Sequence, residues 1–237
     1  MNRRHPARNY KTVDVVVFDK GYAVLLDATP AKIGSVVLQL PTRAFADAIA
    51  QEWREQAKNL DPEQMRLTGL AGTALTLVAQ SRGDVVERIL GFGRNELLCY
   101  RAGEPPELWA RQKAQWDPLL EWVHDRHGIR LVADAGISFI EQPVDAQVRM
   151  QEIVSASDDF ELAALDAAAS LASSFVIALA LVERHIGAEQ AFDVSHLDEL
   201  FQAQKWGRDA EAEARRARII TELKAVERFV SLLSNSN

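Results

Sequence analysis

The chain has 237 residues, of which 48% are hydrophobic and 26% are charged. This composition is typical of a soluble globular protein that folds as one large domain or two smaller ones. Lys and Arg number 27 against 34 Asp and Glu, and the net charge of −7 argues against nucleic acid or an anionic membrane as the main partner. The one cysteine, Cys99, excludes an intramolecular disulfide and fits a reducing compartment. We expect it to pack in the core.

Residues 1–11 carry charges but no apolar stretch behind them, so they do not form a secretory signal. We therefore expect a cytoplasmic protein. Because the segment is rich in arginine, the mitochondrial matrix is the alternative compartment if the chain is a processed eukaryotic form.

Residues 12–40 contain runs of β-branched residues separated by Asp-Lys-Gly and Asp-Ala-Thr-Pro. These runs predict two or three strands joined by turns, and Asp-Lys-Gly predicts a hairpin in which Gly21 supplies a positive φ. A helix is expected over 42–59, because its apolar residues recur at helical spacing. Trp53 lies on that apolar face, which predicts a place in the core.

After residue 60 the strand signal nearly disappears, so we place a boundary there between an N-terminal α/β domain (1–60) and a mainly helical domain (61–237). Helical spacing predicts further helices over 66–80, 83–93, 105–127, 144–155, 158–184, 188–205 and 208–233. The β-like segment 129–140 is expected either to return a strand to the N-terminal sheet or to form its own hairpin. The predicted fold class is α+β, with a short antiparallel sheet and a helix followed by a larger helical part.

Residues 163–182 are nearly as long and apolar as a membrane span. Asp166 and three serines weaken that reading, and the apolar content is mostly alanine. We expect a buried central helix, in which Ser173 and Ser174 bond back to helix carbonyls.

Pro118 lacks an N–H and is poorly suited to a helix interior. Asp117 and Pro118 are therefore expected to be the N-cap and first residue of a new helix, next to an apolar face that includes Trp116.

The late helix around HLDELFQAQKWG (196–207) is apolar on two sides. At about 100° per residue, one stripe looks like a core face, whereas Glu199, Gln202 and Trp206 fall on the other. A tryptophan beside a carboxylate and an amide predicts that this second side is covered, either by another element or by a partner.

No catalytic or metal site is recognisable. GFGRNE (91–96) holds only part of a dinucleotide fingerprint, and His124 and His127 lack a third ligand. His196, Asp198 and Glu199 would project in different directions from a helix, so a metal or enzyme site there is disfavoured. We expect no cofactor and no enzymatic activity.

Five stretches carry a family resemblance. They are LPTRAFADAIAQEW (40–53), LTGLAGTAL (67–75), NELLCYRA (95–102), PPELWARQKAQWDPLLEW (105–122) and LDELFQAQKWGRDAEA (197–212). In this order they resemble the assembly-chaperone family for the alpha subunit of the F-type ATP synthase, known as the ATP synthase mitochondrial assembly factor two family. The family's usual LDGR is LDAT here, which predicts a different first turn.

The resemblance implies a non-enzymatic protein that holds the free alpha subunit until the beta subunit arrives. The family's DE-x-x-Q-x-x-x-WG motif maps onto Asp198, Glu199, Gln202, Trp206 and Gly207, and its EW pair maps onto Glu52 and Trp53. The acidic pair, Gln202 and Trp206 are the expected partner-binding residues. The structural motif residues are Glu52, Trp53, Trp116, Asp117, Pro118 and Gly207. A monomer is expected in the free state, and a helical interaction module with another client is the alternative.

Overall fold

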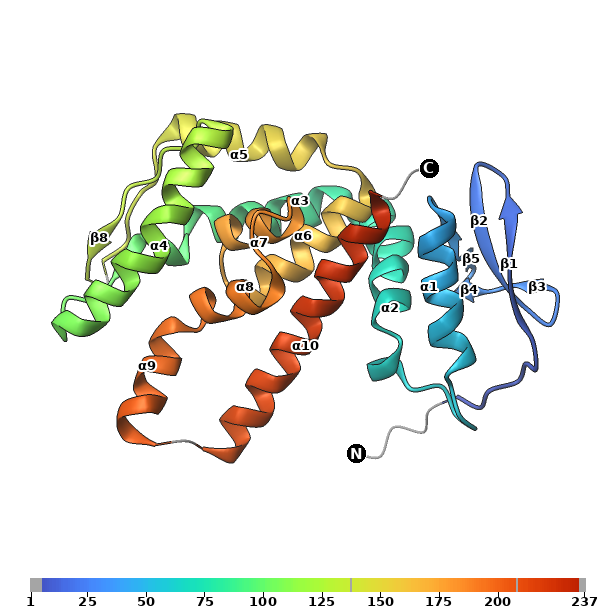
Figure 1. Cartoon of the computed structure of the whole chain (residues 1–237). Coiled ribbons are helices and arrows are strands. Elements are labelled where there is room, and N and C mark those ends of the chain that lie inside the picture. The colour runs from blue at the N-terminus through green and yellow to red at the C-terminus, as the bar shows by residue number, and fades with distance from the viewer. Residues whose placement is uncertain (1–5, 137, 208, 235–237) are drawn as a thin grey trace. The chain divides into compact units, whose positions relative to one another are not determined.

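The computed structural model describes residues 6–136, 138–207 and 209–234 (Figure 1). These residues form two compact units. The first comprises Met1–Ser81 and Arg228–Asn237, and the second comprises Arg82–Glu227. The first unit thus continues beyond residue 60, where the sequence places the domain boundary, and it also includes the end of the chain. Residues 1–5 of the charged N-terminal segment lie outside the described residues.

A four-stranded antiparallel sheet organises the first unit. β1 (Val13–Phe18) and β2 (Gly21–Leu26) pair along their whole length, with Val13 opposite Leu26. Two short strands also pair with β2, and two others form a separate small hairpin. The four short strands are β3 (Thr29–Pro30) and β6 (Gln39–Leu40) on β2, and β4 (Lys32–Ile33) with β5 (Val36–Val37).

The turn between β1 and β2 differs from the prediction. The residue with a positive φ is Asp19, at 50°, and not Gly21. Aspartate tolerates this left-handed conformation better than most residues with a side chain. Gly21 is instead fixed by a close approach, because a Cβ there would collide with the carbonyl oxygen of Leu40 on β6.

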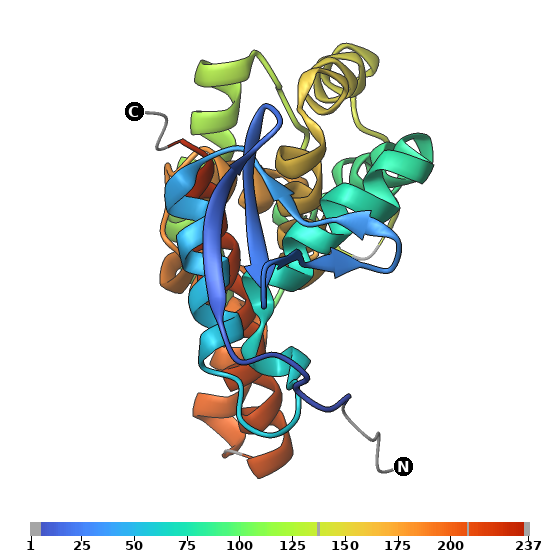
Figure 2. The same ribbon diagram turned by 90° about the vertical axis from the view of Figure 1, so that its right-hand side faces the viewer.

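Helix α1 (Arg43–Arg54) packs against β1 and β2 (Figure 2). The side chain of Thr42 caps its N-terminus by accepting a hydrogen bond from the backbone N–H of Phe45 at 3.1 Å. Phe45 is fully buried and meets the ring of Phe229 edge-on, with 4.9 Å between centroids. Trp53 is 7% exposed, which confirms its predicted place in the core.

One long helical run leads from the first unit into the second. After the 3-10 turn η1 (Pro62–Gln64), it consists of α2 (Arg66–Thr73), the π-helical turn η2 (Ala74–Val78) and α3 (Ala79–Arg94). Ser81 leaves helical geometry with φ −135° and ψ 40°, so the run bends there, at the last residue of the first unit before the boundary. This bend matches the predicted gap between two helices near residues 81–82.

The second unit is helical and is arranged around one apolar helix. Besides most of α3, its helices are α4 (Pro106–His127), α5 (Val144–Ala156), α6 (Asp159–Ala172), α7 (Phe175–Val182), α8 (Ala188–Ser195), α9 (Leu197–Trp206) and most of α10 (Ala210–Leu233). Seven of the eight residues of α7 are buried, and α4, α6 and α8 pack against it. Among the described residues, no helix is both long enough and apolar enough to cross a membrane.

The alanine-rich segment breaks into two helices where the sequence predicted one. Ser173 adopts φ 53°, and Ser174 caps α7 by accepting from the N–H of Ile177 at 3.0 Å. The Ser174 hydroxyl donates to the buried carboxylate of Glu96 at 2.5 Å. The predicted bond from Ser174 to a helix carbonyl is therefore wrong, because the Glu96 carboxylate, just before the 3-10 turn η3 (Leu97–Cys99), is its acceptor.

Helix α4 continues through Pro118, so the predicted start of a new helix at Asp117 is wrong. Proline removes one helix hydrogen bond, the one to the carbonyl of Ala114. Trp116 and Leu119 on either side of it are 1% and 2% exposed, and we attribute the continuity of the helix to this burial.

The segment 129–140, of which residue 137 lies outside the described residues, contributes β8 (Asp134–Ala135). It pairs in parallel with β7 (Tyr100–Arg101), so neither alternative predicted for this segment is right. The predicted helix 188–205 divides at His196 into α8 and α9, and the last helix begins at Ala210, with position 208 outside the described residues. The fold class is α+β as predicted, with a small antiparallel sheet near the N-terminus followed by a helical region.

Candidate functional site

Glu52 and Trp53 have structural positions in the first unit. Glu52 is 8% exposed, and its carboxylate accepts from the backbone N–H groups of Leu67 and Thr68, both at 2.8 Å. It thereby caps the N-terminus of α2, where a negative charge is favourable. Burial raises the pKa of Glu52, although these hydrogen bonds oppose the shift. The hydroxyl of Tyr10 donates to the carbonyl of Trp53 at 2.6 Å.

Trp116 and Asp117 link α4 to other parts of the second unit. The indole Nε1 of Trp116 donates to the carbonyl of Val194 in α8 at 2.8 Å. Asp117 pairs with Arg101 of β7 at 2.7 Å, and the Arg101 guanidinium lies 5.2 Å from the centre of the Trp116 ring. These contacts give both residues a structural explanation.

Asp198 faces α4. Its carboxylate accepts from Nε2 of Gln112 at 2.8 Å, and Gln112 is fully buried. The other end of the same amide accepts from the backbone N–H of Ala102 at 2.7 Å. Asp198 therefore ties α9 to α4 through a buried amide.

Glu199 faces α10. One carboxylate oxygen accepts from Arg215 at 2.5 Å and the other from Arg216 at 2.8 Å, and the Glu199 side chain is 30% exposed. Partial burial raises the pKa of Glu199, but the hydrogen bonds and charges of the two arginines lower it more, so the net shift is downward. We call this three-residue arrangement the α9–α10 clasp. The chain's own arginines therefore engage both carboxylate oxygens of this predicted partner-binding residue.

Gln202 and Trp206 are the exposed members of the predicted set. Trp206 is 74% exposed, and the Nζ of Lys205 lies 6.0 Å from its ring centre. Gly207 ends α9 with φ 100°. The structure therefore brings the four predicted partner-binding residues onto one short helix but divides them into two that anchor α9 and two that are open to solvent.

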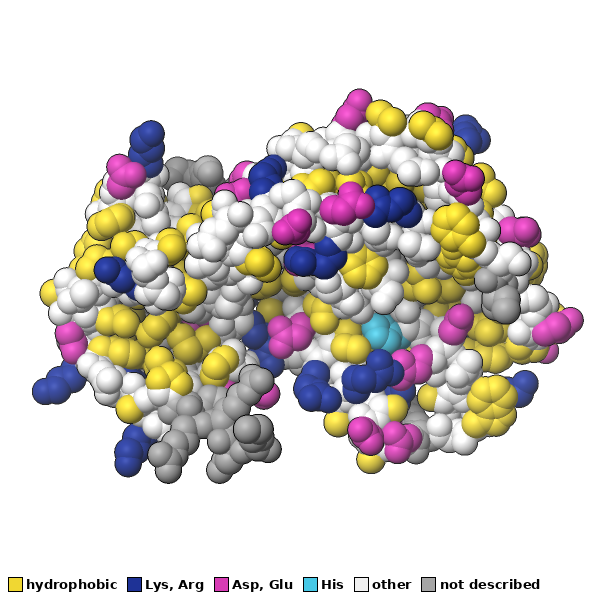
Figure 3. All heavy atoms as spheres, turned by 180° about the vertical axis from the view of Figure 1, so that it is seen from behind, with side chains coloured by type: hydrophobic (Ala, Val, Ile, Leu, Met, Phe, Trp, Pro, Cys, Tyr) yellow, Lys and Arg dark blue, Asp and Glu magenta, His cyan; other side chains and the backbone are white. Residues whose placement is uncertain are grey.

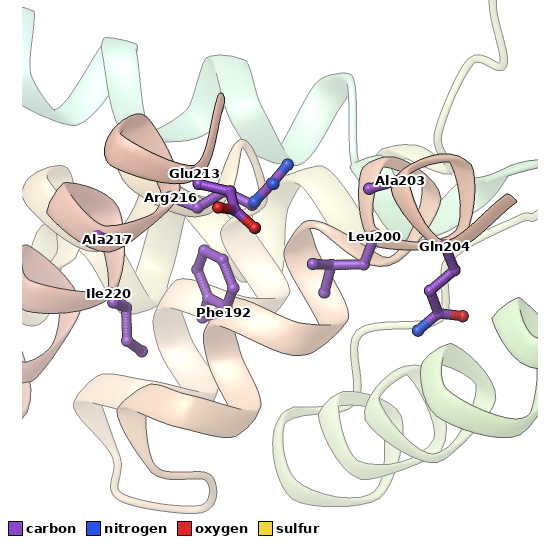
Figure 4. A pocket seen from close by; sticks show the side chains of 8 residues that line it. All are labelled: Phe192, Leu200, Ala203, Gln204, Glu213, Arg216, Ala217 and Ile220. Atoms are coloured by element: carbon purple, nitrogen blue, oxygen red, sulfur yellow. The ribbon is translucent and has the colours of Figure 1, made fainter. Parts of the chain in front are cut away.

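A groove of about 290 Å³ lies between the α8–α9 corner and α10 (Figure 4). Phe192, Leu200 and Ile220 supply apolar walls, and Arg216 brings the α9–α10 clasp to its edge. Sequence reasoning did not single out Arg215, Arg216 or Gln112. A usable signal existed for Arg216, because it recurs at helical spacing with the apolar residues Ile219, Leu223 and Val226 of α10, and a charge buried on such a face requires a partner.

The described residues contain no group of three His, Cys, Asp or Glu side chains arranged to hold a metal ion. His127 instead lies 3.0 Å from Glu183, and the ring of His196 stacks on Phe192 at 4.6 Å. Burial lowers the pKa of His196. Cys99 is fully buried, and burial raises the pKa of its thiol to about 12.

Comparisons with known proteins give consistent matches. A sequence model described as ATP12 chaperone protein matches residues 7–124. The mitochondrial protein atp12 of Schizosaccharomyces pombe is 27% identical over 174 residues, which are 69% of this chain. The match spans 60% of the yeast protein, so the chain covers less than two thirds of that relative's length.

The solved structures give the broader coverage. The crystal structure of Atp12 from Paracoccus denitrificans matches with a TM-score of 0.91 and 35% identity, over 96% of this chain and 98% of that one. A point mutant of the same protein also gives a TM-score of 0.91, at 34% identity over the same shares of both chains. A putative chaperone of Agrobacterium tumefaciens is 36% identical over 97% of this chain and 87% of its own, again with a TM-score of 0.91. Shared fold and sequence over nearly the whole length establish that the chain belongs to the ATP12 chaperone protein family.

Proposed function

We propose that this chain is an assembly chaperone for the F-type ATP synthase that binds the free alpha subunit, prevents its aggregation and releases it to the beta subunit. An alpha subunit that awaits its ring neighbours exposes surfaces meant for burial, and such surfaces promote aggregation. Covering one of them needs neither catalysis nor a cofactor. Family membership supports the chaperone role.

The observation that carries the proposal is the exposure of Trp206 on a helix that is otherwise well anchored. Tryptophan is a frequent anchor of protein interfaces, because it buries a large area on binding. Asp198 and the α9–α10 clasp hold α9 from two sides. The helix that carries the Trp206 indole and the Gln202 amide is therefore fixed in place before a client binds. In this account Asp198 and Glu199 position the binding face, whereas Gln202 and Trp206 contact the client.

Release is proposed to occur by competition. A complex of micromolar affinity corresponds to about 8 kcal/mol, and a ring subunit that buries more of the alpha subunit displaces the chaperone by mass action. Permanent binding would block assembly. The free chaperone is proposed to be a monomer in the bacterial cytoplasm or the mitochondrial matrix.

Affinity capture tests this proposal against its alternative. The tagged chain is expressed at native level in cells that assemble ATP synthase, and captured proteins are identified by mass spectrometry. We expect the alpha subunit to be the main captured protein. We also expect purified beta subunit, when it is added to the beads, to release the alpha subunit from the chaperone. Recovery of a different main partner would instead favour a helical interaction module with another client.

A further inference from the structure

Gly69 occupies a helical position that no contact among the described residues explains. It is an exposed residue of α2, and a Cβ added there would have no atom within 4 Å. Glycine in a helix interior is less favourable than alanine, so an internal reason is expected. Gly72 has one, because its Cβ would come within 3.3 Å of the Ile33 side chain. Beside Gly69 there is thus an open space that no described residue fills.

That space belongs to a cavity of about 420 Å³ on the first unit. Gly69, Gly72, Thr73, Thr76 and Leu77 come from the α2–η2 run, and Trp53 comes from the end of α1. None of the twelve described residues that line it is charged, although 26% of the chain is. We call this cavity the α2 groove. Hydrophobic side chains also gather on the surface of the first unit, at the left of Figure 3.

The three threonines that line the α2 groove already donate their hydroxyl hydrogen bonds within the chain. The hydroxyl of Thr73 donates to the carbonyl of Gly69 at 3.1 Å, and that of Thr76 donates to Gly72 at 2.6 Å. The hydroxyl of Thr68 donates to the buried carboxylate of Glu52 at 2.7 Å. Because these hydroxyl protons are used inside the chain, the groove is adapted to an apolar occupant.

Trp53 supplies a further feature. Its indole Nε1 is buried and has no hydrogen-bond partner among the described residues. A buried N–H without an acceptor is unfavourable. Because Trp53 also lines the α2 groove, a backbone carbonyl of a segment bound there is the acceptor that we consider for this N–H. An extended segment has such carbonyls, whereas those of an α-helix are engaged within the helix.

We infer that the α2 groove binds an extended, uncharged, apolar segment of the client subunit. The inference rests on the proposed function, since a subunit awaiting its neighbours exposes apolar segments of this kind. Leu77, which is 44% exposed, extends the apolar surface at the groove's edge. A charged segment is disfavoured, because the described lining residues offer no countercharge to replace the water lost on binding.

Filling the α2 groove tests the inference. Gly69→Leu places a side chain in the empty space, and Gly83→Leu in α3 is the matched control, because Gly83 is also helical and without an atom within 4 Å of its added Cβ. Affinity for the alpha subunit of the F-type ATP synthase is measured for the full chain and both variants. We expect Gly69→Leu to weaken binding roughly tenfold or more, and Gly83→Leu to leave it unchanged.

Hydrogen–deuterium exchange of the wild-type chain is a second measurement that needs no substitution. We expect slower exchange over residues 66–78 when the alpha subunit is bound. Equal affinity of wild type and Gly69→Leu, or unchanged exchange over 66–78, would overturn the inference while leaving the proposed function in place. Absence of alpha-subunit binding by the wild-type chain would overturn both.

Discussion

Trp53 and Trp206 place the same side chain in opposite environments, 7% and 74% exposed. Both belong to motifs that the sequence resemblance singled out, and only their burial separates a structural residue from a candidate contact. Helical spacing placed Trp53 in the core without any structure. It did not show that Glu199 is bound by Arg215 and Arg216, because a contact between two helices leaves no periodic signal in the sequence.

Replacing each tryptophan by arginine separates these roles. Trp53→Arg is expected to lower the free energy of unfolding by about 3–5 kcal/mol or more, since it removes a core aromatic and buries a charge. Trp206→Arg is expected to change stability by less than about 0.5 kcal/mol, as is usual for an exposed position. Thermal midpoints of both variants check the prediction, and an unchanged midpoint for Trp53→Arg would contradict it.

Charge reversal tests the α9–α10 clasp. Glu199→Lys would bring three cations together, so we expect α9 to loosen and assembled ATP synthase to be recovered in lower yield, while the overall fold persists. The expected loss of unfolding free energy is about 1 kcal/mol, because the ion pairs of Glu199 with the two arginines are partly exposed to solvent. Amide exchange over residues 197–206 and the yield of assembled enzyme are the measurements.

Combining Glu199→Lys with Arg215→Glu restores an opposite-charge pair and is the matched control. Slower exchange in the double variant than in Glu199→Lys, with partial recovery of assembly, is the expected outcome. If the single substitution leaves exchange in α9 and assembly yield at wild-type values, the positioning role of Glu199 is wrong.

At the scale of elements, periodicity predicted where helices occur but not where they break. The division at Ser173 and Ser174 arises from a hydrogen bond to Glu96, 78 residues away, and α4 continues through Pro118 between buried neighbours. Both outcomes depend on tertiary contacts that local sequence does not encode. The parallel pairing of β7 with β8 was missed for the same reason, because two-residue strands have no usable period.

The carboxylate of Glu96 makes the junction of α6 and α7 sensitive to pH. Burial raises its pKa from 4.5 to about 7, against the opposing hydrogen bonds from Ser174 and the start of α7. The folded chain therefore binds this proton more tightly than the unfolded chain, and the contribution of Glu96 to stability falls as pH rises from about 4.5 to about 7. Above that range the contribution is level.

Urea unfolding between pH 4.5 and 8 measures this effect, with Glu96→Gln as the comparison. As pH rises to about 7, the unfolding free energy of the wild type is expected to fall relative to that of Glu96→Gln. Above pH 7 the difference between the two is expected to stay constant. A difference that does not vary with pH would show that Glu96 has an ordinary pKa in the folded chain.

At the scale of the whole molecule, the net charge argues against nucleic acid or an anionic membrane as the main partner. Charged side chains of both signs are distributed over the face shown in Figure 3. The α+β class and the succession of a small sheet and many helices followed from the sequence. The extent of the two units could not be predicted from the sequence, because the last helix begins in the second unit and ends in the first. The sequence resemblance singled out four residues of α9, whereas the contacts that anchor two of them, Asp198 and Glu199, required the structure.

Binding of the alpha subunit by Trp206→Ala tests the central claim most directly. Trp109→Ala is the matched control, because Trp109 is an exposed tryptophan of α4, at 43%, outside the proposed face. With both variants folded as the wild type, we predict that Trp206→Ala weakens the complex about tenfold or more and that Trp109→Ala does not. Equal affinities for the alpha subunit in wild type and Trp206→Ala would contradict the account.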